Sequence, residues 1–245
     1  MTHAPAETPP PASAALLAAA NNADWHAAVF RAHGLSSQTG DGVWWSADPA
    51  PRFFSSVVTT APEPDTEQHA AIEAVAAARP SGFAVKDSFA ALDLGGRGFR
   101  LLFDAEWIWR DPHPPLPAGA TGWHRITDAA ILAAWEAALN PDAPADGTAY
   151  PPAALADPDL AFFARHEAGH IVAGAAANRS LTVVGLSNVF GSRGREDDTY
   201  AAAAALAAGL APGLPVVGYE SGAALDVARR LGFRTVGPLR VWVTG

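Results

Sequence analysis

Two histidines and a glutamate stand at a spacing that could bind a metal. The segment reads His166-Glu167-Ala168-Gly169-His170, which matches the pattern H-E-x-x-H. On a helix, histidines four residues apart share one face and can bind one Zn²⁺, while the glutamate activates a bound water for hydrolysis. A zinc hydrolase with His166 and His170 as ligands is therefore one function that the sequence allows.

The neighbouring residues favour a different structure for this segment. Gly169 and Gly174 would each cost a helix about 1 kcal/mol, and Ile171 between them is β-branched. We expect the apolar runs 160–165 and 170–177 to form two strands of a hairpin with a tight turn between them. We therefore expect no metal, and the zinc hydrolase stays as an alternative.

The composition limits the other kinds of chemistry. The chain has no cysteine, which excludes disulfides, zinc–thiolate sites and cysteine nucleophiles. Its formal charge of −9 opposes nucleic acid or an anionic membrane as partner and tolerates an amine substrate. No apolar run reaches the roughly 20 residues of a membrane span, and the start of the chain lacks the basic region of a secretory signal. We expect a cytoplasmic protein.

An internal repeat gives the longest-range signal in the sequence. DSFAALDL at 87–94 aligns with ESGAALDV at 220–227 at a constant offset of 133, and five of the eight positions are identical. Gly-Phe-Arg and an apolar run follow in both copies. This repeat indicates two copies of one fold. The expected organisation is a disordered tail at 1–21, a domain at 22–110, a proline-rich linker at 111–120 and a domain at 121–245.

Apolar periodicity and turn residues predict the elements that must position these segments. Helices are expected at 24–33, 66–79, 88–94, 129–139, 197–208 and 221–231. Strands are expected at 43–46, 53–60, 82–86, 99–109, 123–126, 160–165, 170–177, 181–189, 216–219 and 233–243. The mixture of both element types in each half predicts an α/β protein.

The segment PVVGYESGAALDVARRLGFRTVGPLRVWV, residues 215–243, resembles the C-terminal part of GNAT-type N-acetyltransferases. The element order of residues 121–245 is similar to that family, and the first half resembles a degenerate copy. The resemblance implies two GNAT-like domains of α/β (α+β) type, each a mixed, largely antiparallel sheet flanked by helices. It also implies direct transfer from acetyl-CoA or another acyl-CoA to a small amine.

The resemblance places the cofactor where a splayed strand enters the next helix. An anion binds there to unpaired N–H groups at the helix N-terminus. In the second half this junction is residues 191–198. It has glycines and arginines but not the family's Arg/Gln-x-x-Gly-x-Gly/Ala turn, and the acids at 196–198 would repel a phosphate. The first-half junction at 60–65 lacks glycine and base, so we expect no CoA there. The implied cofactor-binding residues are Leu186, Ser187, Val189, Phe190, Gly191, Arg193, Gly194 and Arg195.

The tyrosine that protonates the departing thiolate in the family is absent, because its position holds Ala228. Tyr219 and Glu220, at the end of the preceding strand, are the candidates for acid and base, and Asn188 is the third candidate catalytic residue. The missing tyrosine also leaves open a non-catalytic GNAT-like binding module. The oligomeric state stays open.

Overall fold

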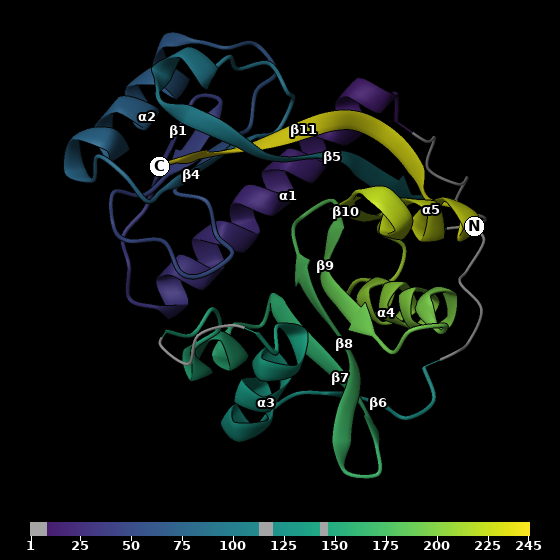
Figure 1. Cartoon of the computed structure of the whole chain (residues 1–245). Coiled ribbons are helices and arrows are strands. Elements are labelled where there is room, and N and C mark those ends of the chain that lie inside the picture. The colour runs from purple at the N-terminus through teal and green to yellow at the C-terminus, as the bar shows by residue number, and fades with distance from the viewer. Residues whose placement is uncertain (1–8, 113–119, 143–146) are drawn as a thin grey trace.

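The computed structural model describes residues 9–112, 120–142 and 147–245, which form one mixed sheet with helices on both faces (Figure 1). The strands lie in the order β1-β2-β3-β4-β11-β5-β10-β9-β8-β7-β6. They are β1 Gln38–Gly40, β2 Val43–Trp45, β3 Val57–Thr59, β4 Ala84–Asp87, β5 Phe99–Arg110, β6 Trp123–Arg125, β7 Leu160–Glu167, β8 His170–Arg179, β9 Val184–Gly191, β10 Val216–Glu220 and β11 Arg234–Thr244. The helices are α1 Pro11–Ala32, α2 Thr66–Ala78, α3 Ala129–Leu139, α4 Glu196–Leu210 and α5 Gly222–Arg230, with 3-10 helices η1 Gly95–Arg97 and η2 Pro152–Ala156.

The two halves of the chain exchange one strand each. β11, at the end of the second half, lies between β4 and β5 of the first half, and β5 lies between β11 and β10. The parallel pairs β3–β4 and β9–β10 occupy matching places on either side of β5 and β11. Four strands on each side of the β5–β11 pair therefore correspond, as two copies of one fold would produce, and β6 is an additional strand at one edge.

Each face of the sheet has its own set of helices. α1 and α3 pack on one face, here called the α1 face, whose buried core includes Trp107 and Trp135. α2, α4 and α5 pack on the opposite face, here called the α4 face. Successive strand residues point to opposite faces, so Val217 belongs to the α1-face core and Val216 to the α4-face core. This alternation decides which side chains of the site can meet.

Side-chain caps fix where two helices begin. The Asp65 carboxylate accepts a hydrogen bond of 2.7 Å from the N–H of Gln68 at the start of α2. Asp128 accepts one of 2.8 Å from the N–H of Ala130 at the start of α3. The first N–H groups of a helix have no acceptor within the helix, so a carboxylate at the N-cap position stabilises the helix. Both helices begin at the residue that the sequence predicted.

The first helix is longer than predicted. α1 begins at Pro11, so residues 11–21 are helical and not a disordered tail; residues 1–8 lie outside the described part of the chain. One side of this extension is made of small residues that pack on the sheet, namely Ala14, Ala15, Ala18 and Ala19. They are buried against Trp107 and Trp109 of β5. The contact is with a distant strand, so the alanine-rich sequence alone did not reveal it.

The helix predicted at 88–94 is absent, and a turn leading into η1 takes its place. The buried carboxylate of Asp87 accepts hydrogen bonds from three backbone N–H groups within residues 89–92. These bonds hold the turn. The matching acid of the second copy, Glu220, accepts a hydrogen bond from Tyr200 instead, and there α5 forms.

The exchange of β5 and β11 bears on the predicted domains at 22–110 and 121–245. Both halves contribute to one continuous sheet, and most of the linker predicted at 111–120 lies outside the described residues. The boundaries stay a prediction. Among the helices of the described segments, none is long and apolar enough to cross a membrane.

Candidate active site where β9 and β10 diverge

β9 and β10 are parallel neighbours that separate soon after they meet. Their register consists of two pairs, Val184 with Val216 and Gly185 with Val217. β9 then continues to Gly191 and β10 to Glu220 outside this register. Where they separate, a β-carbon on Gly218 would lie 2.7 Å from the carbonyl oxygen of Leu186, so only glycine allows this approach. The sheet opens beyond this point. The edge of β9 that faces β10 is therefore not paired with β10 after Gly185.

β9 is irregular at Asn188, a predicted catalytic residue. Asn188 has a φ of 52°, and the register of β9 with β8 shifts next to Gly174. A β-carbon on Gly174 would lie 2.2 Å from Trp135 Nε1 and 2.3 Å from the ring of Phe190. The side-chain amide of Asn188 donates a hydrogen bond to the hydroxyl of buried Tyr150, which fixes it at the opening.

A pocket of about 540 Å³ lies on the α1 face of this opening, and we call it the α1-face pocket. Its apolar lining is Phe53, Phe54, Ala84, Leu102, Phe103, Leu139 and Val241. Its polar lining is Ser55, Lys86, Asn140, Asn188 and Tyr219. Both halves of the chain contribute, and an apolar pocket with a few convergent polar groups at such a junction is the usual form of a small-molecule site.

Lys86 is the only lysine of the chain, and it is 4% exposed. Its Nζ donates a hydrogen bond of 2.9 Å to Asn22 Oδ1 and lies 4.3 Å from the centre of the Tyr219 ring. Burial lowers the pKa of Lys86 to about 7, because the charged form loses its hydration. A large fraction of this amine is therefore neutral at neutral pH.

The predicted acid and base point to opposite faces of β10. Tyr219 lines the α1-face pocket and packs against Trp107, whereas Glu220 accepts a hydrogen bond of 3.0 Å from the hydroxyl of Tyr200 on α4. Burial, with a smaller effect of the Glu220 charge, raises the pKa of Tyr219 to about 12. Burial also raises the pKa of Glu220 to about 7. The two residues are adjacent in sequence, but they do not form an acid–base pair.

A smaller pocket of about 150 Å³ lies on the α4 face of the opening, and we call it the α4-face pocket. β9, α4 and α5 line it. Three of the residues predicted to bind a cofactor are in its lining, namely Val189, Phe190 and Gly191. Leu186 is buried at the start of the opening, and Ser187 is partly buried beside it. The two pockets therefore flank the opening from opposite faces.

The exposed loop before α4 carries the other predicted phosphate ligands, Arg193, Gly194 and Arg195. The carboxylate of Glu196 accepts a hydrogen bond of 2.9 Å from the N–H of Gly194, and this bond lowers the pKa of Glu196. Arg195 forms an ion pair of 3.2 Å with Glu167. The loop thus has the donors of an anion site, but two of them already have carboxylate partners.

The matching junction of the first half, between β3 and α2, is filled by Gln68. The side-chain amide of Gln68 donates to the carbonyl oxygens of Gly42, Ala61 and Glu63 at 3.0–3.3 Å. The side chain of Asp65 caps the helix that follows. The β3–α2 junction and the β9–α4 junction are therefore closed by different contacts. The arginines, Arg193 and Arg195, occur in the β9–α4 junction of the second half.

The H-E-x-x-H segment forms a hairpin and not a helix. Glu167 lies opposite His170 in the β7–β8 pairing, and Ala168 and Gly169 form the turn with φ values of 49° and 83°. The hairpin predicted from the sequence is confirmed. A zinc site of this pattern needs the helical spacing that brings both histidines to one face, so the zinc hydrolase loses its structural basis. His166 and His170 are both exposed.

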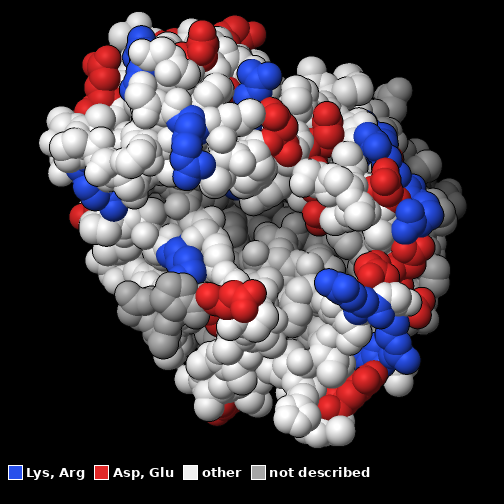
Figure 2. Space-filling view, viewed as in Figure 1, with Lys and Arg blue, Asp and Glu red and all other residues white. Residues whose placement is uncertain are grey.

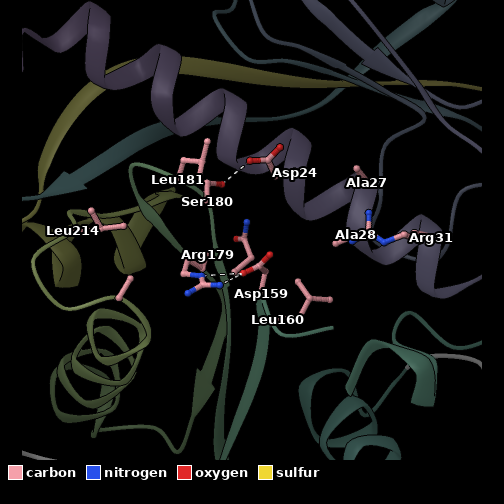
Figure 3. A pocket seen from close by; sticks show the side chains of 12 residues that line it. Asp24, Ala27, Ala28, Arg31, Asp159, Leu160, Arg179, Ser180, Leu181 and Leu214 are labelled. Atoms are coloured by element: carbon pink, nitrogen blue, oxygen red, sulfur yellow. Dashed lines mark hydrogen bonds and ion pairs between the residues drawn. The ribbon is translucent and has the colours of Figure 1, made fainter. Parts of the chain in front are cut away.

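Another pocket, of about 700 Å³, lies at the other end of β8 and β9, beside α1 (Figure 3). Arg179 forms an ion pair with Asp159, and Ser180 donates a hydrogen bond to Asp24. Arg31 also has a carboxylate partner. The face in Figure 2 is hollowed near its middle, with charges of both signs around the hollow. Because the charged groups in this pocket neutralise one another, the pocket does not point to a particular ligand.

Lys86 and Tyr150 are site residues that the sequence analysis missed. Lys86 is the repeat equivalent of Tyr219 at the offset of 133, so the same alignment that indicated the repeat could have marked it. Its being the only lysine was a second signal. Tyr150 stands in a segment rich in proline and alanine without periodicity, and no sequence signal places it.

Solved structures share this architecture. A GCN5-related N-acetyltransferase from Kribbella flavida has a TM-score of 0.63 at 16% identity, over 94% of this chain and 95% of that chain. A putative acetyltransferase from the GNAT family from Novosphingobium aromaticivorans has a TM-score of 0.57 at 14% identity, over 93% and 99%. A functionally unknown conserved protein from Staphylococcus epidermidis has a TM-score of 0.61 at 11% identity, over 86% and 94%. No protein-family profile and no curated protein matches the sequence.

Proposed function

From the fold of the GCN5-related N-acetyltransferases, which this chain shares, we propose that the protein is an acyl-CoA-dependent N-acyltransferase acting on a small amine. The observation that carries the proposal is the divergence of β9 and β10 between two pockets. An acyl group held along β9 approaches the opening from the α4 face, and an amine approaches from the α1 face. Asn188 and Tyr219 line the opening on the amine side.

The residues on the α4 face support binding of an acyl-CoA. The free edge of β9 can hydrogen-bond an extended pantetheine arm as a further strand would. Arg193 and Arg195 supply positive charge for a diphosphate. Glu196 must first leave the N–H of Gly194, because its carboxylate occupies a donor and repels phosphate. When bound, acetyl-CoA supplies an activated acyl thioester.

The transfer forms a bond between the amine nitrogen and the acyl carbon and breaks the bond from that carbon to sulfur. Tyr219 is protonated at neutral pH, and its pKa, raised to about 12, keeps it protonated in moderately alkaline solution as well. Its hydroxyl, beside the opening, is the proposed proton donor to the sulfur, which departs within the opening. The amine must lose a proton to attack. Glu220, with a pKa of about 7, is the proposed base and accepts this proton from the α4 face, across the opening. Asn188 is proposed to orient the amine.

Release of free thiol tests the proposal. The chain has no cysteine, so a thiol reagent reports only the CoA released from acetyl-CoA. The purified protein is incubated with acetyl-CoA and each member of a panel of small primary amines. We expect thiol release that depends on both protein and amine. No thiol release with any amine, together with no calorimetric heat and no thermal shift at millimolar acetyl-CoA, would overturn the proposal.

A non-catalytic GNAT-like binding module is the second candidate. The hydrogen bond from Gly194 to Glu196 favours it, because this bond blocks part of the expected phosphate site. Such a protein would bind an acyl-CoA or an amine and release no thiol. Calorimetric binding of either ligand without turnover across the amine panel would select this candidate over the enzyme.

A further inference from the structure

The α1-face pocket contains a buried lysine and no carboxylate. Among its lining residues only Lys86 and Tyr219 can ionise. A buried ammonium loses its hydration and is stable only with a suitable partner. Lys86 Nζ has one hydrogen-bond acceptor, Asn22 Oδ1, and it also lies over the face of the Tyr219 ring. An ammonium has three N–H donors, so Lys86 has capacity for a further acceptor.

The charged neighbours of Lys86 do not supply that acceptor. Asp87 follows it on β4 and points to the opposite face, where its carboxylate holds the turn at 89–92. His26 on α1 is buried, and its pKa is lowered by burial and by the Lys86 charge, so it is neutral. Within the described residues Lys86 forms no ion pair.

The rest of the lining fits a carboxylate joined to an apolar group. The other polar side chains, Ser55, Asn140, Asn188 and Tyr219, all carry a hydrogen-bond donor. The walls are aromatic and aliphatic, and two of their members at the surface are Phe53 and Leu102, which are 50% and 49% exposed. A volume of about 540 Å³ has room for a molecule the size of an aromatic amino acid.

We propose that this pocket binds a carboxylate on Lys86, so that the acceptor is an amine that also carries a carboxylate and an apolar group. An amino acid with an apolar side chain has this chemistry. The identity of the ligand as acceptor rests on the proposed acyltransferase function, whereas carboxylate binding at Lys86 does not. The test therefore measures binding in the absence of any acyl-CoA.

Three probes with the same ring and different end groups separate the possibilities. Calorimetry compares 3-phenylpropanoate, which is anionic, with 3-phenylpropan-1-ol, which is neutral, and phenethylamine, which is cationic. We expect the carboxylate to bind at least about tenfold more tightly than either of the others, since a buried charge pair with hydrogen bonds exceeds a neutral contact. Equal affinity for the alcohol or the amine, or no binding of the carboxylate, would refute carboxylate recognition.

Variants identify the residue responsible. Lys86→Met keeps a long apolar side chain and should remove the preference for the carboxylate. Lys86→Arg should retain a preference, since it keeps the cation. Arg31→Met is the matched control, because it removes a cation from the other, larger pocket, and should bind as wild type does. A Lys86→Met protein that still prefers the carboxylate would place the anion elsewhere.

A labelling experiment on the wild-type protein answers the same question without a substitution. Lys86 is the only lysine, so mass spectrometry after amine acylation by a reactive ester reports its accessibility directly. We expect 3-phenylpropanoate to slow modification of Lys86, and the alcohol to leave it unchanged. Equal protection by both compounds, or by neither, would contradict the ion pair. Success here with no thiol release would uphold the pocket and overturn the acyltransferase.

Discussion

The ammonium nitrogen of Lys86 lies 4.3 Å from the centre of the Tyr219 ring, although the two residues are 133 positions apart and are equivalent in the internal repeat. β4 and β10, which carry them, are not neighbours in the sheet, because the exchanged strands β11 and β5 lie between them. The side chains meet over these strands, on the α1 face. Two equivalent positions of the sequence repeat therefore lie in a single pocket, and their side chains have different chemistry.

Lys86→Met should raise the free energy of unfolding at neutral pH and flatten its pH dependence. The pKa of Lys86 is about 7 in the folded chain against an ordinary 10.5. The unfolded chain thus binds more protons between these values, and wild-type stability rises with pH across this window. At about 1.4 kcal/mol per unit, the penalty below pH 7 is a few kcal/mol. Urea unfolding from about pH 6 to about pH 10 measures it, with exposed Arg31→Met as control. Wild-type stability that is flat or falls over this range would contradict the expectation.

Glu220→Gln should remove a pH dependence of stability that has the opposite sign and lies at lower pH. The pKa of Glu220 is raised from 4.5 to about 7 by burial. The folded chain therefore binds more protons than the unfolded chain between these values, and wild-type stability falls as pH rises through them. Gln keeps a hydrogen-bond acceptor for Tyr200 and removes the titration, so the variant should be relatively more stable at pH 7 than at pH 4.5. Asp198→Asn on α4, at an exposed position, is the matched control and should follow wild type.

Tyr219→Phe should lower kcat for thiol release by about 10²-fold or more, because it removes the proposed proton donor. KM for acetyl-CoA should change little, since a proton donated to the departing sulfur stabilises the transition state and not the bound substrate. Steady-state kinetics with a fixed amine measures both constants. An unchanged kcat would remove Tyr219 from the chemistry, and an unchanged thermal midpoint would show that the variant is folded.

Glu196→Ala should increase the affinity for acetyl-CoA severalfold. It frees the N–H of Gly194 and removes one negative charge from the N-terminus of α4, where a phosphate is stabilised by unpaired donors. Calorimetric titration with acetyl-CoA measures the change. Asp198→Asn removes a charge from the same turn without freeing that N–H, so it should have the smaller effect. Equal effects of both substitutions would indicate charge alone, and no effect of either would place the diphosphate elsewhere.

Gly174→Ala should destabilise the protein by about 1–3 kcal/mol, the usual cost of overpacking a core. The added methyl group would lie 2.2 Å from Trp135 Nε1 and 2.3 Å from the ring of Phe190. Displacement of Phe190 should also disturb β9 next to Asn188 and lower any activity. Gly209→Ala within α4 is the control, since nothing lies within 4 Å of its new methyl group and a helix favours alanine. Thermal unfolding should show the two substitutions moving stability in opposite directions.

Most elements could be predicted from the sequence, because they depend on local features. Continuous apolar runs marked β7 and β8, and Gly169 and Gly174 disfavoured a helix where the H-E-x-x-H pattern alone would suggest one. Asp65 and the residues before Ala129 marked the starts of α2 and α3. The predictions failed where distant contacts decide. Asp87 converts an expected helix into a turn through a buried carboxylate, and the start of α1 is stabilised by β5.

The sequence by itself determined the fold class, the internal repeat and the candidates Asn188, Tyr219 and Glu220, because periodicity and repeats depend on neighbouring residues. Only the tertiary structure decided which candidates meet. It paired β11 with β4 and β5 with β10 across the halves, turned Tyr219 and Glu220 to opposite faces, and brought Lys86 to Tyr219. Pairing between strands more than a hundred residues apart depends on the packing of the whole sheet, and no local pattern records it.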